Sequence, residues 1–270
     1  MTGFISPEEL EALVRQGREA SFVIIDVRTP REYALDHIPG AVNIPVSGIE
    51  THELILDPCD RLVFYCRNGM RSKVAAFIAS EAGVPENRIF NLTGGMAGYT
   101  GEILLDMPRL EILSGAMSLD ELLNAAMNLE KGAYLFYEMA APLFEGTPVH
   151  PVMVKMGETE VGHARKIFNT LDRPDKGSPS FEEAFQACCG DILEGGKSRV
   201  DMEAFLSGIT AERRLEVLEF ALDMEFSAYD LYKNWALTLP EARAKTLFIS
   251  LVQAEKEHIS DIIRCLDICP

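Results

Sequence analysis

Apolar residues in the first part of the chain, up to about residue 107, form short runs that alternate with stretches of helical composition. The sequence Ser6-Pro-Glu-Glu9 is a capping box with proline at the first helical position, so it predicts a helix before the first run. Apolar, β-branched strands separated by helices are typical of a parallel sheet that is covered on both faces. The pattern therefore predicts an α/β domain. Its strands are expected at residues 22–26, 41–44, 62–65 and 88–91.

The pattern changes near Ser118, where long helical segments rich in Ala, Leu, Met and Glu replace the strand signals. A second capping box, Ser118-Leu-Asp-Glu121, predicts the start of the first of these helices. Pro108 interrupts the local pattern between the two parts. We therefore expect an α/β domain over residues 1–107, a linker over 108–117 and an all-α domain over 118–270.

The stretch CRNGMRS, residues 66–72, follows the apolar run 62–65 and precedes a helical segment, so it predicts a strand-to-helix turn. Backbone N–H groups converge at such a turn, where they bind anions and lower the pKa of a cysteine thiol. A buried structural cysteine is the alternative. Two arginines and a glycine within five residues favour a nucleophile that acts on an anionic substrate. The catalytic candidate is Cys66, and the substrate-binding candidates are Arg67, Asn68, Gly69, Met70, Arg71 and Ser72.

A repeat in the second part of the chain carries the other candidate chemistry. The segment NLEKGAYLFY at 128–137 matches MEFSAYDLY at 224–232, and a Glu-x-x-His pair follows each copy at the same offset of 95 residues. Spacing of i, i+3 puts the carboxylate and the imidazole of a pair on one helix face, where they can share a metal ion. A carboxylate on an apolar stripe needs a partner, and a metal ion provides one. The metal-ligand candidates are Glu130, Glu160, His163, Glu225, Glu255 and His258.

Composition narrows the set of partners. The formal net charge of −17 disfavours binding to nucleic acid or to anionic lipid, because both require basic surface. No run approaches the roughly 18 apolar residues of a membrane helix, and the N-terminus has neither a basic nor an apolar leader segment. The six cysteines form no CxxC pair, which favours free thiols in a reducing compartment. We therefore expect a soluble cytoplasmic protein with no nucleic-acid or membrane partner.

The first part of the chain resembles a rhodanese domain. The matching segments are 26–33, 37–45, the Cys66 loop and 92–95, which together span nearly the whole part. The resemblance implies a doubly wound α/β fold in which Cys66 takes a sulfane sulfur as a persulfide, while the loop backbone and Arg71 hold an anionic donor. Phosphatase chemistry is the main rival in this fold, and its cradle spans Cys-x5-Arg. The spacing here is Cys-x4-Arg, which the resemblance associates with sulfur transfer.

The second part, about 118–268, resembles the rubrerythrin branch of the ferritin-like superfamily. The resemblance implies a four-helix bundle that holds two iron ions, bridged by Glu130 and Glu225 or their neighbours, and that reacts with peroxide or dioxygen. Two departures limit it: Ala228 stands where rubrerythrins carry a further glutamate, and no four-cysteine rubredoxin module is present. The electron donor is therefore left open. Simple oxidation of iron, or storage of another divalent metal, is the alternative.

Together these features predict a sulfurtransferase fused to a di-iron carboxylate domain, with the two activities coupled. The alternatives are a sulfur carrier or sensor joined to a helical domain that stores metal without turnover, or a Cys-dependent phosphatase. The expected small-molecule partners are a sulfur donor, a sulfur acceptor, and peroxide or O2. Related bundles are commonly dimers, so we also expect a homodimer.

Overall fold

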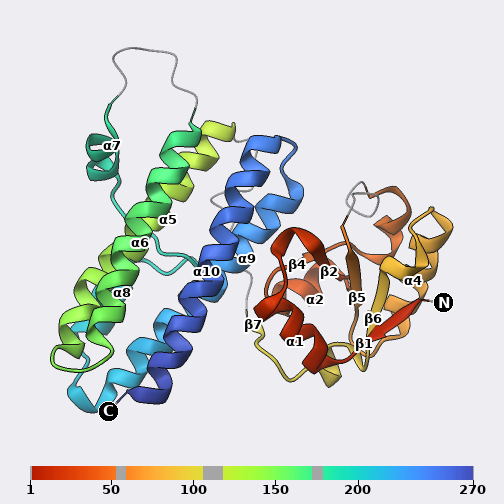
Figure 1. The fold of residues 1–270 in the computed structure, drawn as a ribbon, viewed down its shortest axis with the longest axis horizontal. Helices are drawn as coiled ribbons and strands as arrows, with labels where there is room; N and C mark the ends of the chain where they lie inside the picture. The colour runs from red at the N-terminus through yellow and green to blue at the C-terminus, as the bar shows by residue number, and fades with distance from the viewer. Residues whose placement is uncertain (1, 53–58, 106–117, 172–178, 270) are drawn as a thin grey trace. The chain divides into compact units, whose positions relative to one another are not determined.

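The computed structural model describes residues 2–52, 59–105, 118–171 and 179–269 (Figure 1). Contacts divide the chain into two compact units. The first unit contains Met1–Met107 and Tyr229–Gln253, and the second contains Pro108–Ala228 and Ala254–Pro270. Helices α9 (Arg214–Thr238) and α10 (Ala242–Ile268) therefore contribute residues to both units. The predicted linker at 108–117 lies outside the described residues.

A five-stranded parallel sheet forms the centre of the first unit, with strand order β1-β6-β5-β2-β4. Every strand that the sequence predicted is present, within a residue or two at each end. Strand β1 was not predicted, because its three residues are too few to show a pattern and only one of them is buried. The strands are β1 (Gly3–Ile5), β2 (Phe22–Asp26), β4 (Ala41–Asn43), β5 (Arg61–Tyr65) and β6 (Ile89–Leu92), with a separate antiparallel pair of β3 (Asp36–His37) and β7 (Leu104–Leu105).

Side chains of the central strands alternate between two apolar layers. In β5, Phe64 packs with the layer that contains helix α4 (Met70–Glu81), whereas Tyr65 packs with the layer that contains α1 (Pro7–Gln16) and α2 (Pro30–Leu35). Both faces of the sheet are thus buried, as expected for parallel strands with helical crossovers. The capping box predicted at Ser6 is confirmed, and Thr29 forms a second one at α2.

Residues of α9 belong to the core of the first unit. The ammonium of Lys233 is fully buried and lies 2.7 Å from a carboxylate oxygen of Glu19. Asp230 accepts a hydrogen bond from the backbone N–H of Gly40 at 2.7 Å, and it lies 3.2 Å from Nε2 of His37. Charged side chains of the helix are therefore neutralised by partners near the sheet.

The second unit is helical, as the sequence predicted, and Ser118 caps its first helix with Glu121. Its core contains buried apolar side chains from α5, α6, α8, α9 and α10. Within the described ranges, no helix combines the length and apolarity that a membrane span requires. The helices that precede α9 are α5 (Leu119–Ala140), α6 (His150–Thr170), α7 (Phe181–Ala187) and α8 (Arg199–Ser207).

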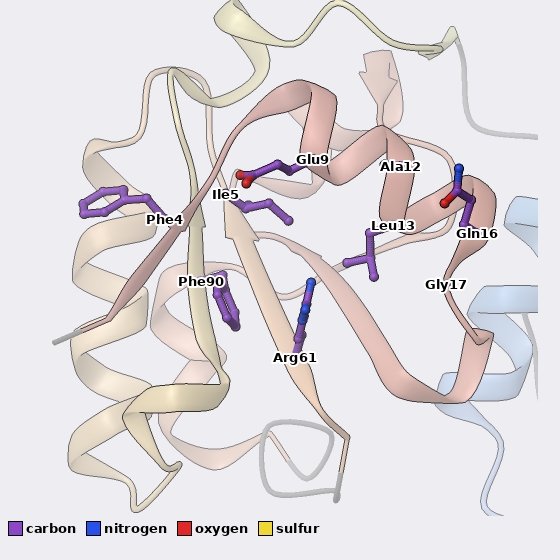
Figure 2. Close-up of a pocket in the computed structure, with 9 residues that line it drawn as sticks. All are labelled: Phe4, Ile5, Glu9, Ala12, Leu13, Gln16, Gly17, Arg61 and Phe90. Atoms are coloured by element: carbon purple, nitrogen blue, oxygen red, sulfur yellow. The ribbon is translucent and has the colours of Figure 1, made fainter.

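A surface hollow of about 470 Å³ lies beside α1 in the first unit (Figure 2). Arg61, the first residue of β5, lines it together with Phe4 and Phe90. Cys66 follows the last residue of the same strand. Five residues of extended chain span about 16 Å, so Arg61 lies about that far from the thiol, and Cys66 is not among the residues that line the hollow.

Candidate active site and metal centre

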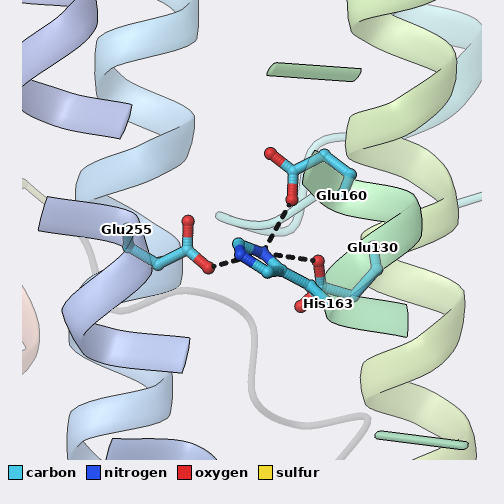
Figure 3. A group of neighbouring side chains, drawn as sticks. All are labelled: Glu130, Glu160, His163 and Glu255. Carbon is cyan, nitrogen blue, oxygen red and sulfur yellow. Dashed lines mark ion pairs between the residues drawn. The ribbon is translucent and has the colours of Figure 1, made fainter. Parts of the chain in front are cut away.

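The six predicted metal ligands converge in the interior of the second unit, where all six side chains are buried. Helices α5 and α9 each supply one glutamate, whereas α6 and α10 each supply a glutamate and a histidine. Their donor atoms form two groups, and within each group the atoms lie within 4.8 Å of one another. The groups are Glu130, Glu160, His163 and Glu255 (Figure 3), and Glu160, Glu225, Glu255 and His258. Either group could hold a metal ion.

Distances around the two histidines fit a metal ion at each. Atom Nδ1 of His163 lies 3.0, 3.2 and 3.4 Å from carboxylate oxygens of Glu160, Glu255 and Glu130. Atom Nδ1 of His258 lies 3.1 to 3.2 Å from oxygens of three glutamates. Two donor atoms bound at a right angle to one ion, each at about 2.1 Å, are about 3.0 Å apart. A single imidazole N–H can donate a good hydrogen bond to only one of the three surrounding oxygens. A metal ion, in contrast, can bond to the nitrogen and to all three oxygens.

Glu160 and Glu255 belong to both groups of donor atoms. Each carboxylate directs one oxygen to each histidine: Oε2 of Glu160 lies 3.0 Å from His163, and Oε1 lies 3.1 Å from His258. The resemblance implied Glu130 and Glu225, or their neighbours, as the bridging residues. In the structure each of these two glutamates belongs to one group of donor atoms only. The glutamate of each Glu-x-x-His pair reaches the other pair's histidine as well as its own, so it takes the central position.

Burial and the charges of neighbouring residues strongly shift the pKa values of the carboxyl and imidazole groups in the cluster. Burial raises the pKa of Glu130 and of Glu225 to about 8, although the neighbouring histidines oppose it. Burial alone would lower the pKa of His163 and of His258, but the surrounding carboxylates outweigh it and raise both well above the usual value.

Tyr137 supports the cluster from α5. It is fully buried, and its hydroxyl donates a hydrogen bond to Oε1 of Glu225. Tyr134, on the same helix, instead donates to the exposed Glu138 at 2.8 Å. Tyr137, seven residues after Glu130, thus faces the site, whereas Tyr134, four residues after Glu130, faces outward.

Cys66 occupies the predicted turn between β5 and α4 in the first unit, and its side chain is fully buried. Its sulfur accepts a hydrogen bond from the backbone N–H of Gly69 at 3.2 Å, and the hydroxyl of Ser72 lies 3.6 Å from it. Gly69 caps the helix with a φ of 88°, in the left-handed region that favours glycine. The backbone can therefore fold its N–H groups around the sulfur.

Hydrogen-bond donors dominate the electrostatics of the thiol. Burial alone would raise the pKa of Cys66, but the Ser72 hydroxyl and the backbone N–H groups of Ser72, Asn68 and Gly69 outweigh it and lower the pKa. The thiolate is the nucleophilic form of cysteine. The turn thus favours the thiolate, and the role of Cys66 as a nucleophile stays a prediction.

The segment after β6 holds the Cys66 turn through backbone hydrogen bonds. Backbone N–H groups of Met96 and Ala97 donate to the carbonyl oxygens of Cys66 and Arg67, at 2.8 and 2.9 Å. A Cβ atom at Gly95 would lie 2.3 Å from the Cys66 oxygen, so the approach requires glycine. Sequence reasoning noted the Gly94-Gly95 pair as a family signature but assigned it no role in the site.

A family model described as "Rhodanese-like domain" matches residues 6–102. The thiosulfate sulfurtransferase GlpE of Pseudomonas fluorescens is 33% identical over 91 residues, which are 34% of this chain and 78% of that protein. The chain belongs to the rhodanese-like family. The family match includes Cys66 and ends before the metal-ligand candidates.

Two further proteins are similar to the rhodanese-like region. YrkF of Bacillus subtilis is 34% identical over 84 residues, which are 31% of this chain and 44% of YrkF. The chain therefore spans less than half the length of that relative. The crystal structure of a rhodanese-related protein from Thermoplasma volcanium is 25% identical, with a TM-score of 0.32, over 38% of this chain and 99% of that one.

Arg71 of the rhodanese-like region forms a two-pronged ion pair with Glu32, at 2.7 and 2.8 Å. The hydrogen bonds from Arg71 hold the pKa of Glu32 well below its usual range. Both side chains are partly exposed, so the pair is screened by solvent and stabilises the fold little. Arg71 therefore lies at the start of α4 in a fixed orientation, with its charge partly offset by Glu32.

A cavity of about 390 Å³ lies beside the Cys66 turn, lined by Arg67 and by Arg28 and Glu32. Met96 and Ala97, which support the turn, also line it. Of the six predicted binding residues, Gly69 and Ser72 are buried against the sulfur, Arg71 is half-buried, and Arg67, Asn68 and Met70 are exposed.

Proposed function

We propose that the rhodanese-like unit is a sulfurtransferase that works through a persulfide on Cys66. The observation that carries this proposal is the set of hydrogen-bond donors around the Cys66 sulfur, which favours the thiolate. The similarity to a thiosulfate sulfurtransferase gives the class of donor, an anion with a sulfane sulfur. Arg67 and Arg71 supply positive charge beside the turn for such an anion.

The reaction has two steps. In the first, the Cys66 thiolate attacks the outer sulfur of thiosulfate, the S–S bond of the donor breaks, and sulfite leaves with the bonding electrons. In the second, a nucleophilic acceptor such as cyanide or a thiolate attacks the outer sulfur of the persulfide, and Cys66 leaves as a thiolate. The donors from Gly69 and Ser72 stabilise negative charge on the same sulfur before the first step and after the second.

Thiocyanate formation from thiosulfate and cyanide tests the proposal, together with the intact mass of protein treated with thiosulfate alone. We expect the wild type to turn over and to gain one sulfur atom. Cys66→Ser should lose both properties, and Cys59→Ser, a half-buried thiol in the same unit, should keep them. Mass gain without turnover would assign a sulfur carrier instead. Hydrolysis of p-nitrophenyl phosphate without sulfur uptake would assign a phosphatase.

We further propose that the second unit binds two metal ions, which we expect to be iron, and that it reacts with peroxide or dioxygen. The converging donor atoms favour this second function, and nitrogen with carboxylate oxygen suits iron, manganese or zinc. His163 and Glu130 would hold one ion, His258 and Glu225 the other, and two shared glutamates would hold both. Iron there would supply the electrons that reduce the oxidant. The burial of all six ligands limits the access of water to the centre.

Elemental mass spectrometry of protein purified anaerobically from iron-replete cells tests metal binding. We expect close to two irons per chain, and their loss in the double variant Glu160→Gln, Glu255→Gln. The control carries Glu158→Gln and Glu257→Gln, exposed glutamates on the same two helices, and should retain the metal. Equal metal in all three proteins would contradict the proposed centre. Two ions other than iron would favour storage of that metal.

The presence of both units in one chain motivates the hypothesis that their activities are coupled. Cys66 persulfide, or its donor, would then act as the reductant for peroxide. Peroxide consumption is measured with glutathione persulfide as the only reductant, in the wild type and in Cys66→Ser. A rate that does not depend on Cys66 would leave two independent activities.

A further inference from the structure

The segment that joins α7 to α8 contains a tight turn in the second unit. The N–H of Leu193 donates to the carbonyl of Lys197, and the N–H of Gly196 donates back to the carbonyl of Leu193, both at 2.9 Å. A charged residue in a turn normally faces solvent. Glu194 is instead buried, with only 2% of its surface exposed.

Two glycine contacts place this turn between α5 and α9. A Cβ atom at Gly132 of α5 would lie 2.6 Å from the carbonyl oxygen of Ile192. A Cβ atom at Gly195 would lie 2.9 Å from the hydroxyl oxygen of Ser227 on α9. Gly132 and Ser227 each come two residues after a proposed metal ligand, which is about 3 Å along the helix axis. The turn therefore lies at the level of the metal centre.

The charges around Glu194 agree with this position. Burial raises its pKa well above the usual value, and the carboxylates of Glu130, Glu160, Glu255 and Glu225 raise it further, in that order. These are the four carboxylates of the proposed centre. Glu194 thus belongs to the same electrostatic cluster, although its chain segment lies outside the repeat that supplies the other ligands.

We propose that Glu194 is a fifth carboxylate of the metal centre, whose side chain turns toward an ion when the centre is loaded, since its oxygens lie outside both groups of donor atoms. The inference rests on the proposed two-metal function. Four carboxylates and two neutral imidazoles carry four negative charges, which balance two divalent ions. A fifth carboxylate adds one negative charge, so it favours a centre in which one ion is trivalent. The connecting segment would in this way set the charge state of the metals.

Titration of the metal-free protein with Co(II), by calorimetry and by absorption spectroscopy under anaerobic conditions, tests the inference. We expect the wild type to bind two ions. Glu194→Gln should bind one of them at least about tenfold more weakly, because loss of a group that tunes a metal site typically costs 10- to 100-fold. Its Co(II) absorption spectrum should also change. Asp191→Asn removes an exposed carboxylate of the same segment and should match the wild type.

A second variant and a second readout separate ligation from packing. Glu194→Asp keeps the charge but shortens the side chain, so it should also weaken one ion while circular dichroism shows an intact helical unit. In iron-loaded protein, Glu194→Gln should shift the reduction potential to a more positive value, because the oxidised state loses a negative neighbour. Two ions bound as in the wild type, with an unchanged spectrum, would overturn the role of Glu194 and leave the two-metal centre standing. Failure of the wild type to bind Co(II) would overturn both.

Discussion

Removal of the Ser72 hydroxyl should make Cys66 a poorer nucleophile without changing the backbone of the turn. Ser72 is fully buried in the first turn of α4, and its hydroxyl makes the largest favourable contribution to the lowered pKa of Cys66. In Ser72→Ala the backbone N–H of Gly69 still donates to the sulfur. The variant therefore isolates one donor of the cradle.

The size of the effect follows from the geometry. A hydrogen bond to a charged group contributes about 1.5–3 kcal/mol. The hydroxyl oxygen lies 3.6 Å from the sulfur, which is long even for a sulfur acceptor, so we take the lower end of that range. A loss of about 1.4 kcal/mol corresponds to a tenfold change in an equilibrium constant, and hence to a roughly tenfold smaller thiolate fraction below the pKa.

Alkylation by iodoacetamide, followed by peptide mass spectrometry across a range of pH, measures this fraction for Cys66 alone. The rate for Ser72→Ala at mildly acid pH should be roughly tenfold lower than that of the wild type, and the two rates should converge at high pH. Ser80→Ala, which alters the same helix eight residues further on, is the control and should leave the profile unchanged. Equal rates for Ser72→Ala and the wild type at acid pH would refute the role of the hydroxyl.

Three further predictions concern both units. Lys233→Met should lower the free energy of unfolding of the first unit in urea by about 3–5 kcal/mol, because it leaves the buried Glu19 carboxylate without its cation. The partly exposed Lys197→Met should cost under about 1 kcal/mol. Burial alone would lower the pKa of His37, but Asp230 outweighs burial and raises it. The His37–Asp230 pair therefore stabilises the folded protein fully below about pH 6.5, and this stabilisation is lost as pH rises through the folded pKa. Asp230→Asn should therefore lower the melting temperature more at pH 6 than at pH 9, and equal losses would contradict the pairing. Loading of two divalent ions at pH 7 should release about four protons, from two histidines and two glutamates with raised pKa values, and about one more where Glu194 also binds. Calorimetry in buffers of different ionisation enthalpy counts them.

Local pattern was enough to predict most of the first unit. Buried parallel strands are continuous apolar runs, so strands β2, β4, β5 and β6 and the position of Cys66 could be read from the sequence. The contact of Gly95 with the Cys66 carbonyl could not be predicted, because it joins segments about thirty residues apart. A glycine in the sequence does not indicate which residue it will contact.

The six metal-ligand candidates could be picked out from the sequence for a different reason. Duplication of a helical hairpin keeps the ligand spacing, so the offset between the two copies identifies all six residues without knowledge of the fold. The pattern says nothing about which carboxylate bridges, since that depends on side-chain directions between helices. Glu194 has no counterpart in the repeat, and only its burial in a turn indicates a role.

The membership of residues 229–253 in the first unit affects how the protein can be dissected. A fragment that stops at residue 107 would keep every segment of the rhodanese-like match, yet it would lose the cation that neutralises Glu19 and the carboxylate that faces His37. Recombinant fragments with one cut are therefore unsuitable for assigning activities to either unit. Point variants in the full-length chain, or a circularly permuted gene that joins the two halves of the first unit, are the appropriate tools.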